Sequence, residues 1–264
     1  MRFTKMHGLG NDYIFLNCME GAPEDLPGLA RRLSDRHFGV GGDGLICVCP
    51  SQRADFKMRM FNADGSEGAM CGNGIRCFGK YVYDKGLADK AHLTIETPAG
   101  ERELSLFLQN GEVTGAAVGM GVPVLGGPVP LLLDGGEYMA VPVSMGNPHA
   151  VMEADDPAAL DLDALGPLAE RHPAFSQPVN AEFVRVLNRR ELQMRVWERG
   201  SGETLACGTG ACASAAAMIA RGKLDREAVV HLPGGDLSVR WEVKSGHMFM
   251  TGPAVTVFDG EFAG

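Results

Sequence analysis

Two cysteines of the sequence directly precede glycine-rich turns. Cys71 begins Cys-Gly-Asn-Gly and Cys207 begins Cys-Gly-Thr-Gly, and a helical pattern follows each of them. The first N–H groups of a helix have no acceptor within the helix, and the helix dipole is positive at that end. Such a helix start binds a carboxylate and lowers the pKa of a thiol from about 8.5 toward neutrality. The sequence therefore predicts two acidic thiols beside two anion-binding turns.

Two thiols of near-neutral pKa suit one reaction in particular. Inversion of a stereocentre next to a carboxylate needs a base on one face of the carbon and an acid on the other. A thiolate and a thiol can fill these roles and exchange them in the reverse reaction. The backbone N–H groups would stabilise the negative charge that develops on the carboxylate. We expect Asn73 and Thr209 to be the N-caps of the two helices.

A repeat relates the two cysteine segments. The sequence numbers of the cysteines differ by an offset of 136 (207 − 71), and further matched segments share this offset. They are Gly10-Asn11 with Gly146-Asn147, residues 58–61 with 194–197, Asn62 with Glu198, and Lys85-Gly86 with Arg221-Gly222. With one residue lost, residues 95–101 match 230–236. These matches predict a duplicated domain rather than a solenoid, whose period is about 20–50 residues. A pseudo-twofold pair would bring both helix starts to one cleft.

Each half of the repeat is predicted to be α/β. Apolar patterning predicts strands over residues 55–62, 92–97, 191–198 and 228–233, and helices over 26–38, 163–172 and 211–220. We expect an N-terminal domain over residues 1–114, completed by a C-terminal strand at about 253–264, and a second domain over 115–252. The Gly- and Pro-rich stretch from Gly115 to Gly136 is expected to connect them.

Composition argues against several classes of function. The chain has 264 residues, 45% of them hydrophobic, which suffices for roughly two cores. Its net charge of −9 argues against a nucleic-acid partner or binding to an anionic membrane surface. The first twelve residues carry no apolar run, and no stretch approaches the roughly 20 apolar residues of a membrane-spanning helix. Seven cysteines without a disulfide-type spacing favour the reducing cytoplasm.

Other cysteine chemistry fits the sequence less well. Neither Cys71 with Cys77 nor Cys207 with Cys212 has the CxxC spacing of a zinc or thioredoxin site, so no metal is expected. No Gly-Lys-Ser/Thr or GxGxxG phosphate motif is present. The remaining five cysteines are expected in the core. They are Cys18, Cys47, Cys49, Cys77 and Cys212.

Five segments spread over the chain carry a family resemblance. They are MHGLGNDYIFLN, FNADGSEGAMCGNGIRC, MGNPHAV, VNAEFV and ERGSGETLACGTGA. The sequence resembles the diaminopimelate epimerase family. The resemblance implies interconversion of LL- and meso-diaminopimelate in lysine biosynthesis, without pyridoxal phosphate or metal. It also implies two similar domains, each a mixed β-sheet curled around a central helix, and a homodimer.

The resemblance assigns roles position by position. Cys71 and Cys207 match the acid/base thiols, while Gly72-Asn73 and Gly208-Thr209 match the turns that bind the reacting carboxylate. The remaining substrate-binding matches are Asn11, Asn62, Asn147, Asn180, Glu198 and Arg199. His149 and Glu198 match positions that tune the cysteine pKa values, and Phe258 matches an aromatic residue of the dimer contact. From the residues alone, turn roles for Asn11 and Asn147 and a structural role for His149 remain open.

Two rival functions share parts of this pattern. Proline racemases and 4-hydroxyproline epimerases have the cysteine pair but usually carry His where this chain has Asn73. The pair Glu198-Arg199 favours a substrate with a second charged end. A non-racemising isomerase of the phenazine type, or a binding protein of the same fold, would lack a reason for two matched thiols.

Overall fold

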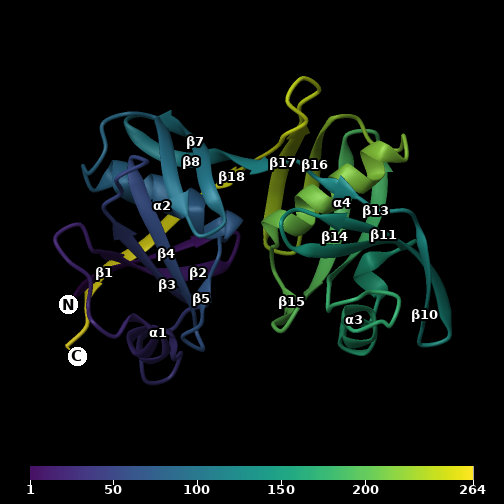
Figure 1. The fold of residues 1–264 in the computed structure, drawn as a ribbon, viewed down its shortest axis with the longest axis horizontal. Coiled ribbons are helices and arrows are strands. Elements are labelled where there is room, and N and C mark those ends of the chain that lie inside the picture. The colour runs from purple at the N-terminus through teal and green to yellow at the C-terminus, as the bar shows by residue number, and fades with distance from the viewer. Residues whose placement is uncertain (264) are drawn as a thin grey trace. The chain divides into compact units, whose positions relative to one another are not determined.

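The computed structural model describes residues 1–263, which form two compact units. Unit 1 comprises Met1–Val118 and the C-terminal segment from Thr251, and unit 2 comprises Gly119–Met250. The chain therefore passes between the units twice, and the C-terminal strand belongs to unit 1 although its sequence neighbours lie in unit 2. In Figure 1 this strand is yellow beside the purple and blue strands of unit 1.

Unit 1 is a mixed sheet with two helices. Its elements are β1 (Arg2–Gly8), β2 (Asn11–Asn17), α1 (Leu26–Ser34), β3 (Gly44–Cys49), β4 (Phe56–Asn62), β5 (Glu67–Gly68), α2 (Gly72–Asp84), β6 (His92–Thr97), β7 (Gly100–Gln109), β8 (Glu112–Gly121) and β19 (Val255–Glu261). β2 and β3 pair in parallel, as do β4 and β6, whereas β1 pairs antiparallel with both β2 and β19.

Helix α2 lies at the centre of unit 1, where it packs against β1, β2, β3, β7 and β19 (Figure 1). Ile75, Phe78 and Val82 are fully buried on it. Burial of each such side chain stabilises the fold by about 1.5–3 kcal/mol. Gly79 permits the close approach of β7, because a Cβ there would lie 2.7 Å from a methyl group of Leu106.

Unit 2 has the same kind of architecture. Its elements are β9 (Val124–Leu125), β10 (Val129–Leu133), β11 (Gly136–Ser144), β12 (Pro148–Glu153), a 3-10 turn (Pro157–Ala159), α3 (Leu162–Glu170), β13 (Asn180–Asn188), β14 (Glu191–Glu198), β15 (Gly202–Thr204), α4 (Gly208–Ala220), β16 (Glu227–Leu232) and β17 (Gly235–Trp241). β18 (Met248–Pro253) leads back to unit 1. The alanine-rich α4 is buried and packs against β11, β12, β13, β14, β16 and β17, since its small side chains allow close approach.

The predicted duplication is confirmed residue by residue. Helices α1 and α3 begin and end at the same offset as the two cysteines (162 − 26), and so do α2 and α4 (208 − 72). The turn that joins β6 to β7 pairs Thr97 with Gly100, and the turn that joins β16 to β17 pairs Leu232 with Gly235. The offset between these two turns is 135 (235 − 100), one less than the offset of 136 between the helices. The single lost residue read from the sequence therefore lies between each central helix and the strand that follows it.

Three details differ from the sequence predictions. The helix predicted over 26–38 ends at Ser34, because Asp35 accepts hydrogen bonds from the N–H groups of His37 and Phe38 and so forms a turn. Helix α4 begins at Gly208, three residues before the predicted start, because the Gly-Thr-Gly turn is already helical. The stretch from Gly115 to Gly136 is not a plain connection, since it contains the end of β8 and all of β9 and β10. Its valines and leucines alternate between buried and exposed positions in β10, and this pattern outweighs the surrounding glycines and prolines. Among residues 1–263, no helix is long and apolar enough to cross a membrane.

Candidate active site

A cysteine caps the start of each central helix. Cys71 has extended backbone angles, and its Sγ accepts a hydrogen bond from the N–H of Gly74 at 3.3 Å. Cys207 does the same for α4, where its Sγ accepts from the N–H of Gly210 at 3.4 Å. The predicted N-caps Asn73 and Thr209 are therefore wrong, and both residues lie within the first helical turn. A thiol at the N-cap lies directly against the positive end of the helix dipole.

Glycines at the helix starts leave room for side chains beneath them. A Cβ at Gly74 would lie 2.6 Å from Cδ1 of Ile46, and a Cβ at Gly210 would lie 2.8 Å from Oε1 of Glu182. Each distance is too short for a real contact, so a larger residue at either position would displace the side chain beneath it. The sequence motif Cys-Gly-x-Gly is thus explained by packing as well as by the exposure of N–H groups.

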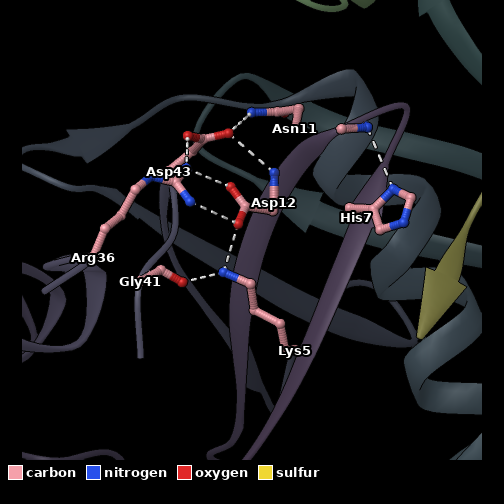
Figure 2. Close-up of polar contacts among 8 residues, drawn as sticks. Lys5, His7, Asn11, Asp12, Arg36, Gly41 and Asp43 are labelled. Carbon is pink, nitrogen blue, oxygen red and sulfur yellow. Dashed lines mark hydrogen bonds and ion pairs between the residues drawn. The ribbon is translucent and has the colours of Figure 1, made fainter. Parts of the chain in front are cut away.

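In unit 1, the side chain of Asn11 faces the thiol of Cys71. Its Oδ1 accepts hydrogen bonds from Cys71 Sγ at 3.2 Å and from Asn73 Nδ2 at 3.3 Å. Its Nδ2 donates to Asp43 Oδ2 at 2.7 Å (Figure 2). A carboxylate only accepts hydrogen bonds, so Asp43 fixes which end of the Asn11 amide faces the helix start.

Asp43 is held in turn by a group of charged residues (Figure 2). Arg36 bridges Asp43 at 2.9 Å and Asp12 at 2.8 Å, and Lys5 contacts Asp12 at 2.6 Å. Burial would raise the pKa of Asp12, but hydrogen bonds and charges from Arg36 and Lys5 outweigh it and lower that pKa to about 2. The group is therefore a network of ion pairs that supports Asn11 from behind.

Two further residues near Cys71 were not singled out from the sequence. Arg76 is fully buried and donates to Gly72 O at 3.1 Å, to Asn73 Oδ1 at 3.0 Å and to Pro253 O at 3.1 Å. It ties the first turn of α2 to the C-terminal strand segment. Its signal in the sequence was a charged residue within an otherwise apolar helical stretch. Tyr13 is buried beside the thiol, and burial and then the charge of Cys71 raise its pKa.

In unit 2, a chain of hydrogen bonds runs from a buried carboxylate to Cys207. Glu182 Oε1 lies 2.6 Å from His149 Nδ1, and His149 Nε2 lies 3.1 Å from Asn147 Oδ1. Asn147 Nδ2 donates to Thr209 Oγ1 at 3.3 Å. Thr209 Oγ1 lies 3.5 Å from Cys207 Sγ. The hydrogen bonds link Asn147, His149 and Thr209, which sequence reasoning named, and end at Glu182, which it did not name.

The electrostatics at Cys207 differ from the sequence prediction. Burial, followed by the charges of Glu198 and Glu182, raises the pKa of the Cys207 thiol well above its ordinary value. Contacts with Thr209 and the Gly210 N–H act in the opposite direction but are outweighed. The predicted lowering of this pKa is therefore wrong. The helix start supplies N–H groups, but the buried carboxylates beside it were not apparent from local sequence.

Glu198 lies at the end of β14 beside this thiol. Its Oε1 accepts a hydrogen bond from Thr204 Oγ1 at 2.5 Å, and burial raises its pKa. A carboxyl group of raised pKa next to a thiol is a second proton-holding group at the same helix start. The positions equivalent to Glu198 and His149 in unit 1 are Asn62 and Tyr13, which carry no carboxylate or imidazole.

The other predicted substrate-binding residues lie at strand ends. Asn62 donates to Ser66 Oγ at 2.9 Å. Asn180 accepts from the backbone N–H of Arg199 at 2.9 Å and donates to Pro148 O at 3.1 Å. Arg199 has an exposed side chain. Phe258 lies on β19, packs edge-on against Phe3 with ring centroids 5.9 Å apart, and is 46% exposed.

The remaining thiols are core residues, as predicted. Each of Cys18, Cys47, Cys49, Cys77 and Cys212 is buried and free of disulfide bonds. Contact with Cys47 raises the pKa of Cys18 to about 12, and burial raises the pKa of Cys77 to about 12. These two thiols are therefore poor nucleophiles at neutral pH. Within residues 1–263, no group of three or more His, Cys, Asp or Glu side chains is arranged to hold a metal ion.

Comparison with known proteins gives one consistent result. Residues 3–126 and 141–257 match the sequence profile of diaminopimelate epimerase. The diaminopimelate epimerase of Acetivibrio thermocellus is 52% identical over 274 residues, which covers 99% of this chain and 98% of that protein. That of Moorella thermoacetica is 51% identical over 276 residues and covers 99% of both.

Solved structures with lower identity share the fold. A hydroxyproline epimerase from Agrobacterium vitis has a TM-score of 0.74 at 16% identity and covers 98% of this chain and 90% of its own. A phenazine biosynthesis protein from Bacillus anthracis has a TM-score of 0.74 at 18% identity, and the match covers 99% of this chain and 98% of that one. At these identities the likeness concerns the fold alone.

Proposed function

The chain belongs to the diaminopimelate epimerase family, and we propose that it interconverts LL- and meso-diaminopimelate with no cofactor. One observation carries the mechanism: both copies of the repeat place a cysteine at the N-cap of the buried central helix. Two equivalent thiols, each beside an anion-binding turn, suit a reaction that needs one acid and one base at the same carbon.

In the proposed mechanism, the substrate carboxylate accepts hydrogen bonds from the N–H groups of Gly72-Asn73 and Gly208-Thr209. The thiolate of one cysteine removes the α-proton and becomes a thiol. The electron pair of the broken C–H bond is delocalised into the carboxylate, where the helix-start N–H groups stabilise it. The thiol of the other cysteine delivers its proton to the opposite face and becomes a thiolate. The reverse reaction exchanges the roles of Cys71 and Cys207.

The distal end of the substrate carries an amino group and a carboxylate. We assign its recognition to residues at strand ends and turns, namely Asn11, Asn62, Asn147, Asn180, Glu198 and Arg199. Arg199 supports this assignment, because its exposed guanidinium can hold a carboxylate through two parallel hydrogen bonds. Asn180 accepts a hydrogen bond from the Arg199 backbone and so fixes the chain that carries this guanidinium.

We further propose that the protein acts in the cytoplasm, in lysine biosynthesis, as a homodimer that uses Phe258. On β19, Val255, Val257 and Phe258 are 39%, 52% and 46% exposed, respectively. Successive side chains of a strand point to opposite faces, so this strand has exposed apolar side chains on both faces, where another protein chain could pack. Sedimentation of the wild-type protein and of Phe258→Asp tests this part independently of the chemistry, since the variant should sediment as the smaller species.

The reaction is tested by incubating the purified protein with LL-diaminopimelate and separating the stereoisomers by chiral chromatography. We expect meso-diaminopimelate to accumulate, at a rate unchanged by a chelator. Cys71→Ala and Cys207→Ala should each abolish the reaction while keeping the thermal unfolding transition. Inversion of L-proline or 4-hydroxyproline in place of diaminopimelate would contradict the proposed substrate, and near wild-type turnover in either variant would contradict the two-thiol mechanism.

A further inference from the structure

Glu182 is a buried acidic residue to which the sequence pattern assigned no role. It lies on β13, and both its side chain and that of its partner His149 are fully buried. Its Oε1 is paired with His149, but no hydrogen-bond partner for Oε2 exists among the described residues 1–263. Burial of a carboxylate oxygen without a partner costs free energy, so the position is unfavourable for stability alone.

The carboxylate lies directly beneath the start of α4. A Cβ at Gly210 would lie 2.8 Å from Glu182 Oε1 and 3.3 Å from Cys207 Sγ. The glycine at this position lets the carboxylate and the thiol approach the same point of the helix start, and a larger residue would displace the carboxylate. A negative charge near a helix N-terminus is favourable, and it also competes with a thiolate for the same N–H groups.

The hydrogen bonds also fix the orientation of the pair. Asn147 donates its amide hydrogen to Thr209, so its Oδ1 accepts, and His149 Nε2 donates to it. The 2.6 Å contact between His149 Nδ1 and Glu182 Oε1 holds the carboxylate at the other side of the ring. The carboxylate side of this pair faces the helix start, while the imidazole side faces Asn147.

The thiol of Cys207 thus has acidic groups from two different strands around it. Glu182 comes from β13 and Glu198 from β14, and His149 of β12 contacts Glu182. A thiolate at Cys207 would add another negative charge to this group. Like charges within a few ångströms disfavour ionisation.

Unit 1 lacks this arrangement at the equivalent positions. At the offset of the repeat, Glu182 corresponds to Ile46 (182 − 136) and His149 to Tyr13 (149 − 136). The equivalence is structural, because Gly74 contacts Ile46 in the same way as Gly210 contacts Glu182, at 2.6 and 2.8 Å from the ideal Cβ. The helix start at Cys71 therefore has an apolar side chain beneath it where that at Cys207 has a carboxylate.

We propose that Glu182, held by His149 beneath the start of α4, is a positioning residue that keeps Cys207 in its protonated thiol form in the substrate-free protein. The two cysteines are then unequal before substrate binds, because only the helix start at Cys207 has a carboxylate beneath it. This deepens the proposed function and rests on it for its catalytic meaning. The inequality itself is a property of the thiols and can be measured without substrate.

The test is the pH dependence of alkylation at each cysteine. Wild-type protein, Glu182→Ile and Glu182→Gln are treated briefly with iodoacetamide between pH 6 and 10, and modified peptides are quantified by mass spectrometry. Glu182→Ile copies unit 1, and Glu182→Gln keeps the shape and a hydrogen bond to His149. In both variants we expect alkylation of Cys207 at pH 8 to rise by about tenfold, the effect of a shift of one pKa unit. Cys71 in the same molecule is the internal control and should keep its wild-type profile.

The outcomes separate the two levels of the proposal. An unchanged Cys207 profile in folded Glu182→Gln overturns the role of Glu182, whether or not the protein epimerises diaminopimelate. Equal rises at Cys71 and Cys207 also overturn it, because they indicate general loosening. If the wild-type protein leaves LL-diaminopimelate unchanged but the Cys207 profile shifts as expected, the proposed function fails and the thiol inequality stands. Should Glu182→Ile unfold, the isosteric Glu182→Gln decides.

Discussion

Asn11 and Asn147 occupy equivalent turns of the two repeats, and they present opposite ends of their side-chain amides to the helix starts. Asn11 directs its oxygen toward Cys71 and Asn73, whereas Asn147 directs its NH2 group toward Thr209. The difference follows from what holds each amide from behind. Asp43 accepts from Asn11, and the Nε2–H of His149 donates to Asn147. The two repeats therefore have equivalent backbones, but one presents an acceptor and the other a donor to its helix start.

Loss of Asp43 should release the Asn11 amide. In Asp43→Ala we expect kcat/KM for epimerisation to fall by about ten- to a hundredfold, because a misplaced group beside the reacting atoms costs rates of this size. Asp43→Asn retains an acceptor for Asn11 and should lose less than about tenfold. Asp155→Ala, which removes an exposed carboxylate of unit 2, is the matched control and should leave the rate unchanged. Equal losses in the Ala and Asn variants would show that the charge of Asp43, rather than its hold on Asn11, matters.

Arg76 should contribute strongly to stability. Arg76→Met removes a buried donor and leaves Asn73 Oδ1 and Pro253 O without its hydrogen bonds. We expect the free energy of unfolding, measured by urea denaturation, to fall by about 3 kcal/mol, since each buried acceptor left unsatisfied costs about 1–3 kcal/mol. Arg2→Met is the control, because the Arg2 side chain is 91% exposed and its ion pair with Glu261 should contribute less than about 1 kcal/mol. Similar losses in both variants would contradict a structural role for Arg76.

The Asp12 network predicts a specific pH dependence of stability. The pKa of Asp12 is about 2 in the folded protein and 3.8 when unperturbed, so its contribution is fully present above pH 3.8 and is lost as the pH falls through 2. At pH 7 the stability difference between wild type and Asp12→Asn should be about 1–2 kcal/mol, allowing for partial exposure to solvent. By pH 3 about half of this difference should be gone. A difference that grows on acidification would contradict the assigned direction.

The sequence predicted those features that depend on local pattern. The repeat offset located both central helices, the glycines that follow Lys85 and Arg221, and the equivalent turns at residues 97–100 and 232–235, because each is encoded within a few residues. The N-caps were predicted as Asn73 and Thr209, since the usual ranking of N-cap residues favours Asn and Thr and does not include a thiol. The glycines that follow each cysteine were the better indication, because they mark the first helical turn.

The supports of the site could not be predicted because they are contacts between distant residues. Asp43 meets Asn11 across 32 residues of sequence, and Glu182 meets His149 across 33. Parallel pairing of β12 with β13 places Ala150 opposite Ala181, and this brings Glu182 of β13 close to His149 of β12. No periodicity in the sequence specifies such a pairing. The raised pKa of Cys207 was missed for the same reason, since the carboxylates that contribute to it lie on β13 and β14.

Isotope exchange gives the most direct test of two thiols of opposite role. A thiol carries one proton, so the proton that one cysteine removes is not the one that the other delivers. In deuterated water, the product formed in the first few percent of conversion should carry deuterium at the inverted carbon. Recovered substrate should carry much less, because return from the same sulfur restores the original proton. Mass spectrometry of the separated stereoisomers measures both pools. A single shared base, or a planar intermediate that equilibrates with solvent, would label them equally, and that result would exclude assigning Cys71 and Cys207 to opposite faces of the substrate.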